Sequence, residues 1–245
     1  MRSQVRVFSD LATASRAAAE ELAGYLRRTV LARGRCGVAL AGGRTPRLLY
    51  ELLAQNGQTP WDRTHLWWTD ERYVPPEDAR SNAQMVYEAL VRRACLPPGN
   101  VHPMPTDFPD PEDAARAYEA ELRSFLRGFG GLDLVLLGMG SDGHVASLFP
   151  GSPAVWEARR WVVAVRAPAE PPSRLTLTFP VLRAARRVDV VVVGVRKRAA
   201  LRRALMGPPD PLTCPASAVS SREGLVVWWV DRAAAGRGVP WAEVS

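Results

Sequence analysis

The chain has 245 residues, and its 32 lysines and arginines against 25 acidic residues give a formal charge of +7. With 47% hydrophobic and 23% charged residues, the composition is that of a globular protein and excludes intrinsic disorder. All the cations but Lys197 are arginines. They are spread through predicted helices beside Glu or Ala rather than gathered in one stripe, so the sequence predicts no nucleic-acid partner.

The cysteines and the apolar runs bear on the compartment. Cys36, Cys95 and Cys214 are odd in number and show no CxxC spacing, so we expect free thiols in a reducing cytoplasm rather than disulfides or a zinc site. The longest apolar runs, such as 190–195, are far too short to cross a membrane, and no signal peptide is predicted. The oligomeric state stays open, and a monomer is compatible with the sequence.

Short apolar runs alternate with amphipathic stretches, a pattern typical of a parallel sheet covered by helices on both faces. No repeat or linker divides the chain, so one α/β domain is expected over residues 1–245. The predicted strands are 5–8, 37–41, 65–69, 132–137, 161–165, 175–178, 188–193 and 226–231. The predicted helices are 10–33, 46–55, 81–93, 111–126 and 197–205.

Three helix starts carry capping signals. Thr45 offers a hydroxyl before Pro46, which suits the first helical position. Ser81 and Gln84 match a capping box, and Asp110 precedes a proline and two acidic residues that favour the positive end of a helix dipole.

Ligands of such sheets collect where strands end and helices begin. The first such point is the segment Leu-Ala-Gly-Gly-Arg-Thr-Pro at 40–46. Gly42 and Gly43 let the backbone approach an anion, and the helix start at Thr45 favours phosphate, with Arg44 as a further cation. A tight turn with a good cap would use the same residues.

The second point follows the strand at 65–69 and reads Asp70-Glu71-Arg72. Two carboxylates can bind the hydroxyls of a polyol, and a guanidinium matches the oxygens of a phosphate. A solvated charged turn is the alternative.

The third point is the glycine-rich segment 138–151. Its Gly138-x-Gly140-x-x-Gly143 spacing formally matches a dinucleotide fingerprint. That fingerprint requires a following helix, which Pro150 and Pro153 interrupt, and an acidic residue at the next strand end, which is missing. NAD binding is therefore disfavoured.

His144 lies in this segment, beside Asp142. An imidazole can act as a general base near neutral pH, and a neighbouring carboxylate can fix its tautomer. A histidine that only caps the loop would fit the same residues. The sequence offers neither a GxSxG nucleophile turn nor metal ligands at useful spacing, so a serine hydrolase and a metal centre are both disfavoured.

Lys197 stands out because every other cation is an arginine. It follows a predicted strand at a predicted helix start, where a cation opposes the helix dipole unless an anion is bound. Survival of a single lysine by chance is the alternative.

In this order, the motifs resemble the 6-phosphogluconolactonases, a group related to the glucosamine-6-phosphate deaminases. The resemblance implies a Rossmann-like, mostly parallel α/β domain of the NagB/RpiA/CoA transferase type. The deaminases carry a glutamate five residues after the histidine, where this chain has Phe149, and commonly a tyrosine where it has Arg72. Both departures favour the lactonase. The matching pieces are 42–46, 70–75 with 81–82, 138–151, 172–178, Gly194 with Lys197, and 215–217.

The resemblance implies hydrolysis of 6-phospho-D-glucono-1,5-lactone without metal or organic cofactor. His144 would activate the water, and Asp142 would orient the imidazole of His144. The remaining candidate residues would bind the substrate, with a sugar-phosphate isomerase or deaminase as the alternative function. These binding residues are Gly42, Gly43, Arg44, Thr45, Asp70, Glu71, Arg72, Arg174 and Lys197.

Overall fold

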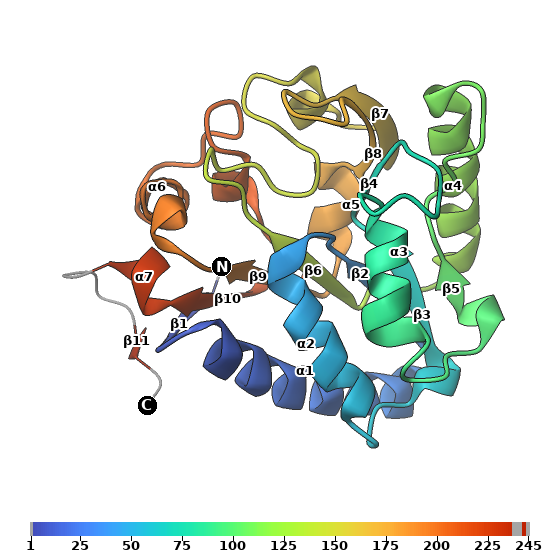
Figure 1. Ribbon diagram of the computed structural model, residues 1–245, viewed down its shortest axis with the longest axis horizontal. Helices are drawn as coiled ribbons and strands as arrows, with labels where there is room; N and C mark the ends of the chain where they lie inside the picture. Colours follow the sequence, from blue (N-terminus) through green and yellow to red (C-terminus); the bar gives the residue numbers. More distant parts are fainter. Residues whose placement is uncertain (1, 237–241, 244–245) are drawn as a thin grey trace.

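The computed structural model describes residues 2–236 and 242–243, and its centre is a parallel sheet (Figure 1). All the paired strands of this sheet run parallel, and its inner strands are buried on both faces, as continuous apolar runs predict. The strand order is β11 (Ala242–Glu243), β1 (Arg2–Phe8), β10 (Leu225–Asp231), β9 (Arg187–Val192), β6 (Leu134–Gly138), β2 (Cys36–Leu40), β3 (Thr64–Trp68) and β5 (Val101–His102).

Helices cover both faces of this sheet. Helices α1 and α2 pack together on one face, and α6 joins β9 to β10 in the opposite direction across the sheet. Right-handed crossovers place it on the other face, which confirms the predicted Rossmann-like α/β class. The helices are α1 (Leu11–Arg33), α2 (Arg44–Gln55), α3 (Asn82–Val86), α4 (Pro111–Phe125), α5 (Phe179–Ala184), α6 (Arg198–Met206) and α7 (Arg232–Ala235). Short 3₁₀ turns span Trp61–Arg63, Pro98–Asn100, Pro153–Trp156, Val195–Lys197 and Pro215–Ala218.

Two predicted strands belong to a second sheet. The stretches predicted at 161–165 and 175–178 form β7 (Val162–Arg166) and β8 (Ser173–Leu177), which pair antiparallel with β4 (Asp70–Arg72). This small sheet lies above the main sheet in Figure 1. The six residues between β7 and β8 allow a hairpin but are too few for the crossover that parallel strands need. The expectation that both strands join the parallel sheet was therefore wrong.

The helix starts follow the predicted caps with one exception. Ser81 accepts a hydrogen bond from the Gln84 amide and Asp110 accepts one from the Glu112 amide, as predicted. Helix α2 instead begins one residue before Thr45, after Gly43, whose φ of 92° suits glycine. No side chain caps α2, so the amides of its first turn are left for another acceptor.

The helix predicted at 81–93 changes character after α3. It continues as a π turn over Tyr87–Val91. No helix within the described ranges is long and apolar enough to cross a membrane.

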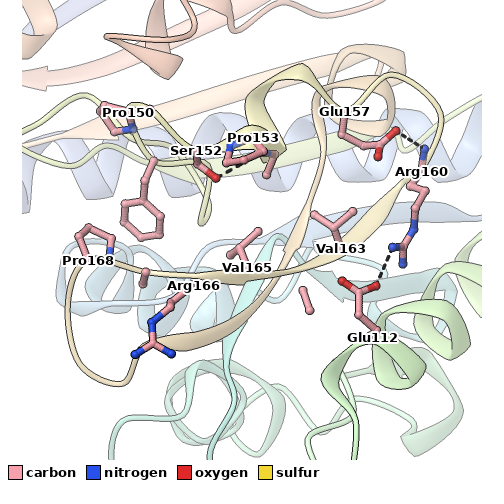
Figure 2. A pocket seen from close by; sticks show the side chains of 15 residues that line it. Glu112, Pro150, Ser152, Pro153, Glu157, Arg160, Val163, Val165, Arg166 and Pro168 are labelled. Carbon is pink, nitrogen blue, oxygen red and sulfur yellow. Dashed lines mark hydrogen bonds and ion pairs between the residues drawn. The ribbon is translucent and has the colours of Figure 1, made fainter.

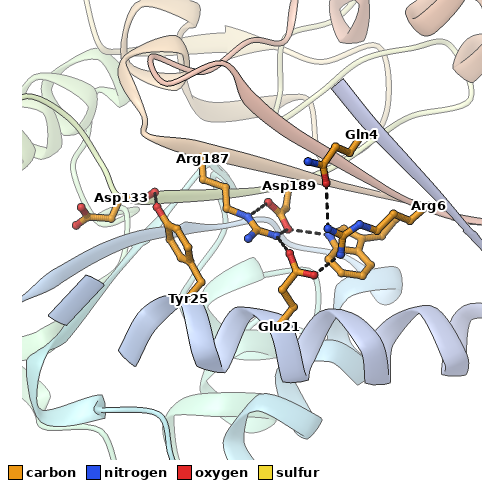
Figure 3. Close-up of polar contacts among 8 residues, drawn as sticks. Gln4, Arg6, Glu21, Tyr25, Asp133, Arg187 and Asp189 are labelled. Atoms are coloured by element: carbon orange, nitrogen blue, oxygen red, sulfur yellow. Dashed lines mark hydrogen bonds and ion pairs between the residues drawn. The ribbon is translucent and has the colours of Figure 1, made fainter. Parts of the chain in front are cut away.

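A buried ionic network joins α1 to the middle of the sheet (Figure 3). Arg187 and Asp189 on β9 are 3% and 0% exposed, and the Nε–Oδ1 distance between them is 2.6 Å. Arg187 also meets Glu21 of α1 at 2.8 Å, and the indole of Trp229 donates to Asp189 at 2.7 Å. Arg6 completes the network through Glu21. Every charged group of this network has a partner of opposite sign.

Candidate functional site

A cavity of about 210 Å³ lies where the ends of β2, β6 and β9 meet the start of α2 and the small sheet. It is where the carboxyl ends of parallel strands predict a ligand. Nine of the eleven sequence-predicted site residues line it, whereas Glu71 and Asp142 do not. The nine are Gly42, Gly43, Arg44, Thr45, Asp70, Arg72, His144, Arg174 and Lys197.

His144 and Asp142 form a hydrogen-bonded pair at the cavity wall. Nδ1 of His144 lies 2.7 Å from Oδ1 of Asp142, which also accepts the His144 amide at 3.2 Å. Burial raises the pKa of Asp142, but the hydrogen bonds from His144 outweigh it and lower the pKa to about 2. Because Asp142 occupies Nδ1, the tautomer that it favours leaves Nε2 free to take a proton. The ring packs against Phe149, with 4.6 Å between centroids.

The glycine spacing of this segment serves the pair rather than a dinucleotide. A Cβ on Gly140 would lie 2.1 Å from His144 Nδ1 and 2.3 Å from Asp142 Oδ1. The Gly140 amide also donates to the His144 carbonyl at 2.9 Å and closes the loop. Gly143 has a φ of 96° and packs against Cys214, where a Cβ would come within 2.7 Å of Sγ. Two of the three glycines are thus needed for the tight loop that presents His144.

Arg72 and Arg174 lie directly opposite each other on β4 and β8. Like charges in this position repel. Within the described residues neither forms an ion pair with a carboxylate: Arg72 donates to the Arg80 carbonyl and Arg174 to the Pro171 carbonyl, at 2.6 and 2.8 Å. Burial and the neighbouring Arg72 lower the pKa of Arg174, which is only 7% exposed, while the charges of Asp70 and Glu71 oppose the shift. A bound anion would relieve both the repulsion and the desolvation.

Lys197 and the start of α2 add positive potential to the same cavity. Lys197 makes no hydrogen bond or ion pair with any described residue, and burial lowers its pKa while Asp142 opposes the shift. The uncapped first turn of α2 reaches the cavity through Gly43, Arg44 and Thr45. Cations and free amides that converge in this way bind phosphate.

Two residues in the cavity region were not among the predicted site residues. Asn82 lines the cavity, donates to the Asp70 carbonyl at 2.9 Å and lies so close to Gly42 that a Cβ there would be 1.8 Å from its Oδ1. Gly42 is therefore needed for contact with Asn82, not only for approach to an anion. The hydroxyl of Ser147 donates to the Asp70 carboxylate at 2.7 Å, and both residues are buried. The sequence signal for both was their place inside the motifs, beside Ser81 and three residues after His144.

Ser147 also follows a strained residue. Ala146 lines the cavity with a φ of 50°, a left-handed conformation that costs about 1–2 kcal/mol for a residue other than glycine. The Ser147 amide donates to the hydroxyl of Thr176 at 3.1 Å. Two hydrogen bonds thus hold the turn between His144 and the small sheet.

Glu71 has a structural role instead of the predicted sugar contact. It is 1% exposed and accepts the amides of Arg72, Asn82 and Ala83, each at 2.7 Å. Burial raises its pKa to about 7, against the amide hydrogen bonds that favour the carboxylate. The Glu71 carboxylate thus caps the start of α3. The Gln84 side chain, which a capping box would place at this helix start, instead donates to Glu88.

A larger cavity of about 740 Å³ lies beside β7, against the segment 149–157 (Figure 2). Its lining is mostly apolar, and Arg160 is paired with Glu112 at 2.6 Å. It contains none of the predicted site residues. The residues that line a cavity, rather than its volume, therefore identify the candidate site. Among the described residues no group of three or more histidines, cysteines or acidic residues could hold a metal ion.

Comparisons with known proteins agree with this geometry. Residues 9–228 match the family model described as glucosamine-6-phosphate isomerases/6-phosphogluconolactonase. The chain is 39% identical to a 6-phosphogluconolactonase of Mycobacterium tuberculosis, over 97% of this chain and 99% of that protein. It is 38% identical to a 6-phosphogluconolactonase of Synechocystis, over 85% of this chain and 87% of that protein.

A solved structure gives the same picture. The crystal structure of a 6-phosphogluconolactonase from Thermotoga maritima superposes with a TM-score of 0.84 at 34% identity. The match covers 94% of this chain and all of that one.

Proposed function

The chain belongs to the glucosamine-6-phosphate isomerase/6-phosphogluconolactonase family and hydrolyses 6-phospho-D-glucono-1,5-lactone to 6-phospho-D-gluconate; from this premise we propose that His144 is the general base. The reaction is the second step of the oxidative pentose phosphate pathway. The observation that carries the proposal is the His144–Asp142 pair, which faces a cavity with two arginines that form no ion pair with a described carboxylate.

In the proposed mechanism, Nε2 of His144 takes a proton from a water in the cavity as the water oxygen attacks C1 of the lactone. The resulting oxyanion collapses, the bond between C1 and the ring oxygen breaks, and the imidazolium returns the proton to that oxygen. Asp142, ionised above about pH 2, holds the ring and stabilises its cationic form. General base catalysis of this kind contributes about 10²–10⁴-fold.

The 6-phosphate would bind to Arg72, Arg174 and Lys197, aided by Arg44 and by the amides of α2. Support comes from the opposed arginines, from Lys197, which forms no hydrogen bond or ion pair with a described residue, and from the uncapped helix start. Asp70 would accept a substrate hydroxyl, because its carboxylate lines the cavity and receives only hydroxyl donors in the described structure.

Phe149 argues against deaminase chemistry at this site. Ring opening and isomerisation of an amino sugar phosphate need a further acid or base, and the resemblance places a glutamate at this position in the deaminases. Here an apolar ring, 6% exposed, packs on His144. Release of ammonia from glucosamine 6-phosphate would reveal the alternative activity.

The test is a coupled assay that generates the lactone in situ. We expect His144→Ala to reduce kcat by about 10²–10⁴-fold while its circular dichroism spectrum stays that of the wild type. Asp142→Asn, which keeps the size of the side chain, should lose activity because it no longer favours the reactive tautomer. A folded His144→Ala variant with normal turnover would exclude the histidine as the base.

We also propose a cytoplasmic protein that binds no nucleic acid. Three free cysteines support the reducing compartment. Many arginines are paired with carboxylates rather than presented as a basic stripe. A DNA-binding titration at physiological salt tests the statement on nucleic acid.

A further inference from the structure

A second cavity of about 500 Å³ adjoins the catalytic cavity. The two cavities have four lining residues in common: Gly43, Arg44, Arg72 and Asn82. The two cavities therefore adjoin along the start of α2, one residue of β4 and one residue of α3. None of the steps proposed for lactone hydrolysis uses the second cavity.

The lining of the second cavity is strongly cationic. Four arginines contribute to it, whereas Glu88 is its one carboxylate among the described residues. The arginines are Arg44, Arg47, Arg72 and Arg80.

Two of these arginines are already neutralised. Arg47 meets Glu51 at 3.2 Å and Glu88 at 3.3 Å. Arg80 meets Asp78 at 2.6 Å, and this pair lowers the pKa of Asp78 to about 2. Neither arginine lines the catalytic cavity.

The other two arginines line both cavities and form no ion pair with a described carboxylate. Arg44 makes no hydrogen bond or ion pair with any described residue, and Arg72 donates only to the Arg80 carbonyl. The Nε of Arg72 is buried without a hydrogen-bond partner. The single 6-phosphate proposed for the catalytic cavity would leave positive potential from these cations on the side of the second cavity.

We propose that the second cavity is an anion subsite for ligands that carry two or more phosphoryl groups. One phosphoryl group occupies the proposed phosphate site, and the next contacts Arg44 and Arg72 from the second cavity. The proposal rests on the proposed phosphate site, since Arg72 belongs to both. Such a ligand excludes the 6-phosphate of the lactone, so it is a competitive inhibitor.

The probes are inorganic tripolyphosphate and orthophosphate, in metal-free buffer at constant ionic strength. Calorimetry without lactone measures binding, and the coupled assay measures inhibition. We expect one molecule of tripolyphosphate per chain, bound at least about tenfold more tightly than orthophosphate, with competitive kinetics. Equal affinities, a non-competitive pattern, or several molecules per chain would overturn the subsite.

Two variants outside the proposed machinery give opposite shifts. Glu88→Gln removes the acidic group of the second cavity and should tighten tripolyphosphate binding about threefold. Arg47→Gln removes a cation, leaves Glu88 without that partner and should weaken binding about threefold. The KM for the lactone stays unchanged in both, and their melting temperatures report folding. If neither variant shifts the affinity for tripolyphosphate, the probe binds only in the catalytic cavity.

The outcome is separable from that of the proposed function. Tight tripolyphosphate binding with no effect of His144→Ala on turnover would remove the general base and keep the subsite. If the wild-type enzyme is fully active in a histidine-dependent way but binds the two probes equally, the general base is kept and the subsite is removed.

Discussion

Two regions of this protein bury arginines, and they treat the charge in opposite ways. Beneath α1, Arg187 meets both Asp189 and Glu21, so its charge is compensated within the fold. At the cavity, Arg72 and Arg174 face each other and neither forms an ion pair with a described carboxylate, although the charges of Asp70 and Glu71 act on Arg174. A compensated buried charge fixes elements together, whereas an uncompensated pair costs stability until an anion binds. The difference marks which arginines serve the fold and which serve the ligand.

The largest expected effect on stability comes from the compensated region. Asp189→Ala leaves the Arg187 guanidinium without its closest partner and should lower the free energy of unfolding by about 3–5 kcal/mol. Urea denaturation measures the change, and Asp189→Asn, which keeps the volume, is the matched control for packing. If the comparison holds, the activity per folded molecule stays that of the wild type.

The uncompensated pair should behave in the reverse way. Arg174→Met keeps the apolar stem but removes a charge that repels Arg72, so the melting temperature should stay the same or rise. The loss of a phosphate contact should remove about 2–4 kcal/mol of transition-state stabilisation. It should lower kcat/KM mainly by raising KM. A clear drop in stability with an unchanged KM would reassign Arg174 to the fold.

Ser147 combines features of both regions. Its hydroxyl is buried and hydrogen-bonded within the fold, yet it holds the turn that follows His144 in the site. Ser147→Ala leaves the Asp70 carboxylate with an unmet acceptor and frees the strained turn at Ala146, at a cost of about 1–3 kcal/mol in stability. If the turn positions His144, kcat falls while the KM for the lactone changes little. Ser147→Thr keeps the hydroxyl and should restore part of the loss. Full activity in the alanine variant would limit Ser147 to a structural role.

The smallest expected effect is on the pH dependence of stability. Burial, followed by the charges of His102 and Arg35, lowers the pKa of His65 to about 4 from 6.5. The unfolded chain therefore binds more protons between these values, and stability falls as the pH drops from about 6.5 to about 4. The half-exposed ring limits the loss to about 1 kcal/mol. His65→Phe should reduce this pH slope in thermal melts, and an unchanged slope would contradict the assignment.

The sequence alone predicted most elements of the fold, because local signals mark them. Apolar runs predicted the buried strands, and capping residues predicted the starts of α3 and α4. The start of α2 was predicted wrongly because Thr45 looked like a cap, whereas the positive φ of Gly43 set the boundary. The residues of β7 and β8 were recognised as strands, but their sheet was not, since apolar pattern alone does not identify the partner strand.

The candidate site, like the fold, was predicted only in part from the sequence. The motif residues in the loops after β2, β3 and β6 were found in the sequence, since each follows a strand that ends at the same edge of the sheet. The sequence could not show which of the two adjacent acidic residues faces the cavity. In the structure Asp70 lines the cavity, and Glu71 turns away to the start of α3. Only the antiparallel pairing of β4 with β8 places Arg72 opposite Arg174. The sequence states which side chains are charged. Whether a charge has a partner of opposite sign depends on residues that are distant along the chain, so only the tertiary structure decided which arginines are compensated.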